Sequence, residues 1–193
     1  MKTFEELLSE AEKAHGHLCA GQILGVRMAL YGLRLLGLDD PAGKDRKRLV
    51  TFVEIDRCAT DAIAVVTGCR LGKRALKFRD FGKVAATFCD LDESRAVRVT
   101  ALESAKLRAR EMYPEIQSKN LQQMKAYREL PDEGLFSVQW VRVDLGPEEL
   151  PGYKAPRAMC SACGEVIQFK REVIREGRVL CRACAGERYY EPL

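Results

Sequence analysis

Residues 20–37 read AGQILGVRMALYGLRLLG, and this stretch decides the fold. As a helix, it places apolar side chains around most of its circumference, among them Ile23, Leu24, Met28 and Leu35. A helix that is apolar on all sides is buried in the centre of a domain and does not lie at its surface. Gly37 suits the left-handed residue that ends many helices. We therefore predict a central buried helix that ends at Gly37.

The segments on either side of this helix predict an α+β fold. Thr3 and Glu6 have the spacing of a capping box, which predicts a short first helix. Stretches with alternating apolar residues or many β-branched residues predict strands. Stretches with apolar residues at helical spacing predict helices near the middle of the chain. The expected strands are residues 49–55, 75–78, 84–89, 96–101 and 135–143, and the expected helices are 61–66, 103–113 and 114–128. Because the order lacks regular βαβ units, we expect a mixed α/β core with a mainly antiparallel sheet around the buried helix.

A linker divides this core from a small C-terminal module. Pro147, Pro151, Gly152 and Pro156 lie close together between the last expected strand and a cysteine-rich tail. Proline and glycine at this density interrupt helices and strands. We therefore predict a core domain over 1–152 and a separate small domain over 157–193.

Composition indicates a globular protein of the cytoplasm. The 193 residues are 47% hydrophobic and 31% charged, and the net charge is only +4. No apolar run approaches the roughly 18–20 residues of a membrane-spanning helix, and the start lacks the layout of a signal peptide. Such a mild charge does not single out nucleic acid as a partner, so we expect neither nucleic acid nor membrane binding. Eight cysteines in such a chain favour metal binding or reactive thiols over disulfides.

The tail carries two CxxC pairs with the spacing of a zinc site. Cys160 and Cys163 form the first pair, and Cys181 and Cys184 follow after seventeen residues. Each pair makes a tight knuckle that presents two thiolates, and two knuckles complete a tetrahedron around one ion. The segment between them predicts a hairpin that turns at Glu176 and Gly177. We predict a zinc-ribbon or treble-clef domain; iron or a redox-active dithiol are the alternatives.

A second group of potential ligands lies near the N-terminus. His15, His17 and Cys19 fall within five residues, and imidazole with thiolate suits zinc, iron, nickel or copper. Helix-capping histidines beside a buried cysteine would be the structural alternative. Cys58 follows a predicted strand and precedes a helix, whose N-terminus favours the thiolate form. Asp61 could orient a histidine or act as acid and base, so Cys58 and Asp61 are also candidate catalytic residues.

A basic segment follows over residues 70–83, with six cationic side chains against one acidic one. Arg70 and Lys73 are candidates for contacts with an anionic substrate or cofactor. A solvated basic surface explains the same pattern. Cys69 could face the same space as Cys58 or be an inert buried thiol, and Cys89 is expected in the core.

Four ordered motifs resemble the FmdE family, named after one of the subunits of the molybdenum- or tungsten-dependent formylmethanofuran dehydrogenase of methanogens. They are His15-Gly-His-Leu-Cys19-Ala-Gly21, Cys58-Ala-Thr-Asp61-Ala-Ile, Thr67-Gly-Cys69-Arg-Leu-Gly-Lys73 and Asp80-Phe-Gly-Lys83-Val-Ala. The resemblance covers about residues 1–143, and some members of the family also carry a C-terminal zinc finger. Ala20 departs from the family pattern, in which proline is expected, and this puts the turn after Cys19 in question.

The resemblance implies an α+β core, a homo-oligomer such as a homodimer, and a cleft in which the histidines and cysteines gather. It places His15, His17, Cys19 and Cys58 at the cleft. It also implies an association with molybdenum or tungsten (molybdopterin) oxidoreductases.

Three functional hypotheses follow, in this order. The first is a metal-binding accessory protein of such an oxidoreductase, in which His17, Cys19 and Cys58 bind a second transition metal and His15 is a fourth ligand or a nearby base. The second is an enzyme with Cys58 or Cys19 as nucleophile, a histidine as base, and Lys73 or Arg70 as anion clamp. The third is a zinc-finger adaptor or regulator that binds a protein or nucleic acid.

Overall fold

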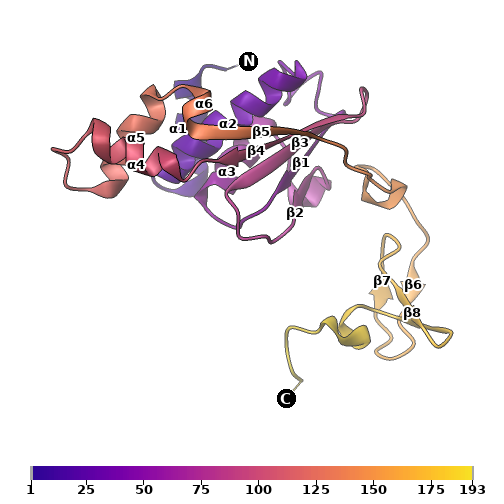
Figure 1. Cartoon of the computed structure of the whole chain (residues 1–193). Coiled ribbons are helices and arrows are strands. Elements are labelled where there is room, and N and C mark those ends of the chain that lie inside the picture. Colours follow the sequence, from indigo (N-terminus) through magenta and orange to yellow (C-terminus); the bar gives the residue numbers. More distant parts are fainter. Residues whose placement is uncertain (1, 193) are drawn as a thin grey trace. The chain divides into compact units, whose positions relative to one another are not determined.

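The computed structural model describes residues 2–192 of the chain (Figure 1). Contacts divide the chain into two compact units, Met1–Val143 and Asp144–Leu193. The domain limits expected from the sequence, 1–152 and 157–193, place the end of the core nine residues later and the start of the tail thirteen residues later, and they stay predictions. No helix within 2–192 is long and apolar enough to cross a membrane.

The first unit is built on one sheet of five strands, with helices before β1, between β1 and β2, and between β4 and β5 (Figure 1). The strand order is β2-β1-β3-β4-β5; β1 and β2 are parallel, and every other neighbouring pair is antiparallel. The mainly antiparallel α+β core expected from the sequence is therefore confirmed. Its elements are α1 (Phe4–His15), α2 (Ala20–Leu36), β1 (Leu49–Val53), α3 (Cys58–Thr67), η1 (Leu71–Lys73), β2 (Leu76–Phe78), β3 (Ala85–Asp90), β4 (Arg95–Ala101), α4 (Ser104–Met112), α5 (Lys119–Glu129), α6 (Asp132–Leu135) and β5 (Phe136–Val141).

Helix α2 is the centre of the core, as its sequence predicts. It packs against β3, β4 and the helices α1, α3 and α5. Ile23, Val26 and Met28 are completely buried, and the helix ends at Gly37, whose φ is 70°. The side chains of one sheet face join the same core: Leu49, Val53, Ala86, Phe88, Val97 and Val99. The apolar circumference of α2 is thus covered by the sheet and by other helices.

Two glycines let α2 and α3 approach closely. A Cβ atom at Gly25 would lie 2.4 Å from the carbonyl oxygen of Ala59, and one at Gly21 would lie 2.9 Å from Cβ of Cys58. Only hydrogen fits at such distances, so any larger residue would force the helices apart. This approach brings the start of α3, with Cys58, beside the start of α2.

Several element boundaries differ from those expected. Helix α3 begins at Cys58, three residues before the predicted start. Helix α5 begins at Lys119, not near Pro114, because the Ser118 side chain accepts a hydrogen bond from the Leu121 amide and caps the helix there. The four-residue helix α6 has no predicted counterpart.

The second unit contains two small hairpins and short helical segments. Its elements are η2 (Pro147–Glu149), β6 (Ala158–Met159), β7 (Val166–Ile167), β8 (Val173–Arg175), β9 (Arg178–Leu180) and η3 (Ala183–Glu187). The predicted turn at Glu176 and Gly177 is confirmed: both residues have positive φ, as a type I′ hairpin turn requires. The first part of the expected hairpin instead pairs β7 with β6, because Phe169 and Lys170 adopt positive φ and interrupt the strand.

Candidate metal centres

The connection between α1 and α2 brings three potential metal ligands together. His15 is the last residue of α1, and Gly16, at φ 95°, reverses the chain. Cys19 is the N-cap of α2, and its side chain makes no capping hydrogen bond, so the thiol is not used to cap the start of the helix. One ligand atom each from His15, His17 and Cys19 lie within 4.8 Å of one another. The left-handed glycine thus converts three neighbouring residues into a convergent group.

His15 is fixed in orientation by a residue of α3. Its Nδ1 lies 2.8 Å from Oδ2 of Asp61, so the Nδ1–H donates to the carboxylate. The other ring nitrogen, Nε2, is buried and has no hydrogen-bond partner within residues 2–192. An orphaned buried nitrogen on a histidine held by a carboxylate is the arrangement of a metal-binding imidazole. Of the two roles considered for Asp61, the structure shows contact with the histidine.

Cys58 lies beside Cys19 without joining the three-residue group. It is the first residue of α3, and its Cβ and the Cys19 Sγ both lie within 4 Å of the position that a Cβ at Gly21 would take. The completely buried Gln22 donates from Nε2 to the carbonyl oxygen of Cys58 at 2.6 Å, which fixes the backbone there. Burial and the neighbouring Cys19 thiol raise the pKa of the Cys58 thiol above its ordinary value. In the metal-free chain these effects oppose the thiolate preference expected at this helix N-terminus, which stays a prediction.

The remaining predicted site residues lie elsewhere. Arg70 is the N-cap of η1 and Lys73 is its last residue; both are exposed, and neither belongs to the His/Cys group. Cys69 is 3% exposed, and its Sγ contacts Thr51 and Leu49 of β1. Cys89 lies within β3, and burial raises the pKa of its thiol to about 12. Cys69 and Cys89 are thus buried thiols.

Two residues of the site environment were not predicted. Gln22 is a polar side chain in an otherwise apolar helix, and that contrast was a signal in the sequence. Asn120, from α5, accepts a hydrogen bond from the Ala20 amide at 3.2 Å and so caps α2 in place of Cys19. No local pattern could reveal a partner that is one hundred residues away.

The four tail cysteines converge in the second unit. Their sulfur atoms lie within 4.8 Å of one another, and Sγ of Cys163 and Cys181 are 3.9 Å apart. Tetrahedral zinc with Zn–S bonds of about 2.3 Å separates its sulfurs by about 3.8 Å, so the donor set fits this metal. Cys160 is almost fully buried, and hydrogen bonds from the backbone amides of Cys163 and Cys181 lower the pKa of its thiol to about 6. The second pair begins a helical turn, η3, which fits the treble-clef alternative.

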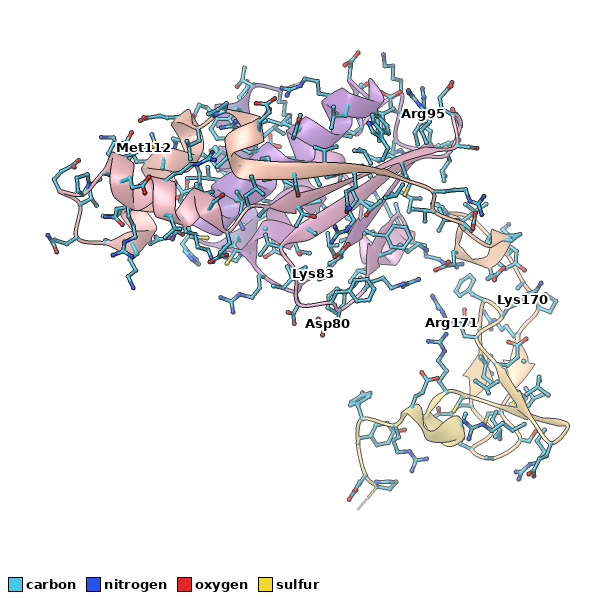
Figure 2. The ribbon with its side chains drawn as sticks, in the orientation of Figure 1. Asp80, Lys83, Arg95, Met112, Lys170 and Arg171 are labelled. Atoms are coloured by element: carbon cyan, nitrogen blue, oxygen red, sulfur yellow. The ribbon has the colours of Figure 1, made fainter. Side chains whose placement is uncertain are left out.

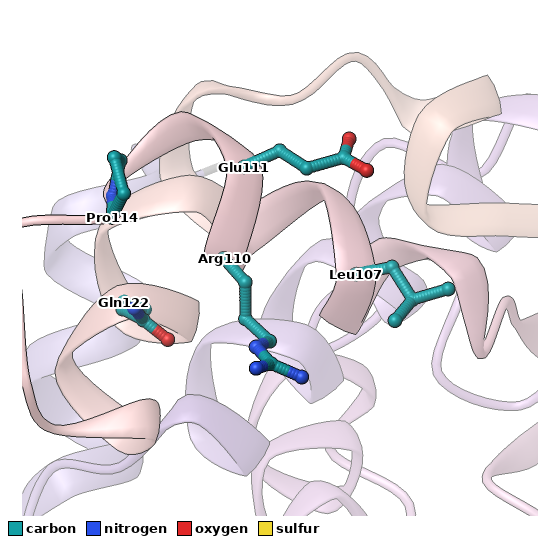
Figure 3. Close-up of a pocket in the computed structure, with 5 residues that line it drawn as sticks. All are labelled: Leu107, Arg110, Glu111, Pro114 and Gln122. Carbon is teal, nitrogen blue, oxygen red and sulfur yellow. The ribbon is translucent and has the colours of Figure 1, made fainter.

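Two hollows lie on the first unit. One, of about 430 Å³, is formed by α4 and α5 and is lined by Leu107, Arg110, Glu111, Pro114 and Gln122 (Figure 3). Its rim is strongly exposed; Leu107, for example, is 58% exposed. The other, of about 350 Å³, is more enclosed and lies between α2, α5 and the residues that join β4 to α4.

Comparison with known proteins identifies the family to which the first unit belongs. The family described as "FmdE, Molybdenum formylmethanofuran dehydrogenase operon" matches residues 14–137, which include all of the candidate core ligands. The chain belongs to the FmdE family. The family described as "Prokaryotic dksA/traR C4-type zinc finger" matches residues 153–190. This FmdE protein therefore carries a C-terminal zinc finger, and its four-cysteine cluster supports zinc as the metal of the tail.

Two relatives extend the comparison. A probable S-adenosyl-L-methionine-binding protein of Archaeoglobus fulgidus is 32% identical over 206 residues, which is 95% of this chain and 53% of that protein. The FmdE chain thus spans about half the length of this curated relative. A crystal structure of a tungsten formylmethanofuran dehydrogenase FmdE-like protein from Syntrophus aciditrophicus has a TM-score of 0.64 at 20% identity, covering 98% of this chain and 96% of that one. It shows that the two proteins share a fold.

Proposed function

We propose that the core binds a second transition-metal ion through His15 Nε2, His17 and Cys19, with Cys58 as the fourth ligand. The observation that carries this proposal is the buried Nε2 of His15, which has no partner within residues 2–192 although Asp61 holds the other nitrogen. A bound ion would relieve that unsatisfied group and draw in the Cys19 and Cys58 thiols as thiolates.

Each residue has a distinct part in such a site. Asp61 would keep the His15 ring in the tautomer that leaves Nε2 as a lone-pair donor, and it would increase the basicity of the ring. Gln22 would hold the Cys58 backbone at the start of α3. A metal ion bound here would supply Lewis acidity or electron transfer, and mixed nitrogen and sulfur donors suit zinc, iron, nickel or copper.

We infer an accessory role beside a molybdenum or tungsten oxidoreductase. The support is the description of the family and the name of the Syntrophus protein, both of which refer to formylmethanofuran dehydrogenase. A homodimer is part of the same proposal. In this role the core would deliver or hold a metal or a thiol-bound group for the larger enzyme.

Metal analysis of the full chain tests the core site. Protein purified without oxygen should contain two metal ions per chain by plasma mass spectrometry. A His17→Ala/Cys19→Ser double variant should retain only the tail zinc, and a Cys163→Ser/Cys184→Ser variant should retain only the core metal. Each variant is thus the control for the other. One ion per chain in the wild type, unchanged by the core substitutions, would show that the core holds no metal.

The accessory role has its own test. The tagged full chain, recovered from its native cells, should bring with it molybdenum or tungsten in a fixed ratio to the chain. Recovery of the chain without either element, from cells in which a molybdenum or tungsten oxidoreductase is active, would reject the association and leave the metal-site test unaffected.

A further inference from the structure

The hollow of about 350 Å³ in the first unit has features of a ligand pocket. Pockets for small molecules have volumes of about 300–1,000 Å³ and combine apolar walls with a few placed polar groups. Leu24, Val84 and Ala105 supply apolar walls, and polar groups come from β4, α4, α5 and the loop before β3. Its lining residues are Leu24, Gly82, Lys83, Val84, Thr100, Ala101, Leu102, Glu103, Ala105, Lys106 and Tyr127.

Tyr127 carries an unused hydroxyl group at this hollow. The residue is only 3% exposed, yet its hydroxyl forms no hydrogen bond with any group of residues 2–192. The hydroxyl oxygen is not among the fully buried unpartnered atoms, so it is open to water or to a ligand. Burial, followed by the nearby charge of Glu103, raises the pKa of Tyr127 to about 12, so the hydroxyl remains a donor at neutral pH. Since Tyr127 and Glu103 both line the hollow, we place the hydroxyl on its inner surface.

The charged groups of the hollow leave one positive charge unmatched. Lys106 Nζ contacts both carboxylate oxygens of Glu103 at 2.8 and 2.9 Å, so these two residues neutralise each other. Lys83 lies on the loop between β2 and β3 (Figure 2), and its ammonium has no ion-pair partner in the described part of the chain. The net charge of the lining residues is therefore +1.

We infer that this hollow binds a small organic monocarboxylate, with Lys83 and the Tyr127 hydroxyl contacting the carboxylate and Leu24, Val84 and Ala105 contacting its apolar body. A single unmatched positive charge suits a monoanion, whereas a phosphate carries nearly two negative charges at neutral pH. A small hydrophilic anion is not the preferred ligand, because it would leave the apolar side chains of the hollow facing water. This site is independent of the proposed core metal.

Binding of benzoate, cyclohexanecarboxylate and hexanoate to the full chain tests the inference. Amide resonances of residues 82–84 and 100–106 should shift saturably in two-dimensional nuclear magnetic resonance spectra with at least one of the three. Lys83→Gln should weaken binding about tenfold, as expected for loss of a charged hydrogen-bond partner. Lys47→Gln removes an exposed lysine that does not line the hollow, and it should bind as the wild type does.

A second variant distinguishes binding from folding. Because the Tyr127 hydroxyl has no partner in residues 2–192, Tyr127→Phe should keep the melting temperature of the wild type while weakening carboxylate binding several-fold. Benzamide, the neutral analogue of benzoate, should bind about tenfold more weakly than benzoate. If none of the three carboxylates binds saturably, or if Lys83→Gln and Tyr127→Phe bind as the wild type does, the hollow is not a carboxylate site.

Discussion

At the scale of single residues, Asp61 fixes the orientation of the His15 ring through a contact with Nδ1. The two residues are 46 positions apart in the sequence, and their contact depends on the packing of α1 against α3. Asp56 is also close to Cys58 in sequence and is exposed. The two aspartates therefore make a matched pair for mutation.

We expect Asp61→Asn to lower the affinity of the core for its metal about ten- to a hundredfold, because an amide cannot support the imidazole as a carboxylate does. Competition with a chromophoric chelator measures this affinity. Asp56→Asn should leave it unchanged, and both variants should keep the tail zinc. Equal affinities for Asp61→Asn and the wild type would show that His15 is not a ligand.

A second residue-scale prediction concerns Asp90, whose carboxylate is completely buried and bound by Arg48. Burial alone would favour the protonated acid, but the hydrogen bonds and charge of Arg48 outweigh it and hold the pKa of Asp90 below its ordinary value of 3.8. A lowered folded-state pKa adds stability above the unfolded pKa, and that stability is lost as pH falls through the folded value. At neutral pH, urea unfolding should therefore give the wild type a higher free energy of unfolding than Asp90→Asn. This difference in free energy should narrow below pH about 4. A difference in free energy of unfolding that stays constant down to pH about 2 would contradict the ion pair of Asp90 with Arg48.

At the scale of elements, glycine determines how close α2 and α3 lie. Alanine is a better helix former than glycine by about 1 kcal/mol. At Gly25, however, the added Cβ would lie 2.4 Å from a backbone oxygen, and a backbone atom cannot rotate away. The steric cost of alanine at this position should therefore exceed the stability gained from its higher helix propensity.

We expect Gly25→Ala to lower the free energy of unfolding by about 1–3 kcal/mol. Denaturant unfolding monitored by circular dichroism gives this value. Gly72→Ala is the control, because no atom lies within 4 Å of its Cβ position and its φ is not positive. If Gly25→Ala proves as stable as Gly72→Ala, the two helices do not pack as described.

The elements also show how far the sequence could predict the structure. Helix α2, its end at Gly37 and the first capping box follow from local signals, and all are confirmed. The start of α3 was misplaced because Arg57, its N-cap, makes no side-chain cap. In the tail, positive φ at Phe169 and Lys170 was not predictable from residues that seldom adopt it.

The features of the candidate sites also divide into those that local sequence could predict and those that it could not. Candidate ligands close in sequence, such as His15 with Cys19 or the two CxxC pairs, could be predicted from spacing alone, and the structure brings each of these groups together. The carboxylate on His15, the Asn120 cap and the Tyr127 hollow depend on contacts across 46 residues or more, or on packing, and only the folded chain reveals them.

At the scale of the whole molecule, the two units differ in what stabilises them. The first has an extensive apolar core, whereas the buried cluster of the second contains only Cys160, Ile167, Leu180 and Ala185 among the described residues. Four side chains, one of them a metal ligand, remove little apolar surface from water. The metal must therefore provide much of the stability of the tail.

Removal of zinc by a strong chelator should unfold the tail and leave the first unit folded. Limited proteolysis would then cut within 157–193 and leave a resistant core. Cys160→Ser, without chelator, should give the same fragments. A tail that remains resistant after its zinc has been removed would show that its apolar contacts suffice.

The proposed homodimer is also a property of the whole molecule. Light scattering during size-exclusion chromatography should give twice the 21.7 kDa mass of one chain. The mass should not change when zinc is removed if the first unit forms the interface. A mass of one chain at micromolar concentration would exclude a stable dimer.

The Asn120 cap on α2 has a consequence for the order of events during protein synthesis. All of the proposed core ligands have been translated once Cys58 is added, but the amide of Ala20 gains its partner only after residue 120 has left the ribosome. Chain elongation proceeds at about 5–20 residues per second, so a nascent chain has its proposed core ligands for seconds before the start of α2 beside Cys19 is capped. We therefore expect the core to acquire its metal late, on a nearly finished chain.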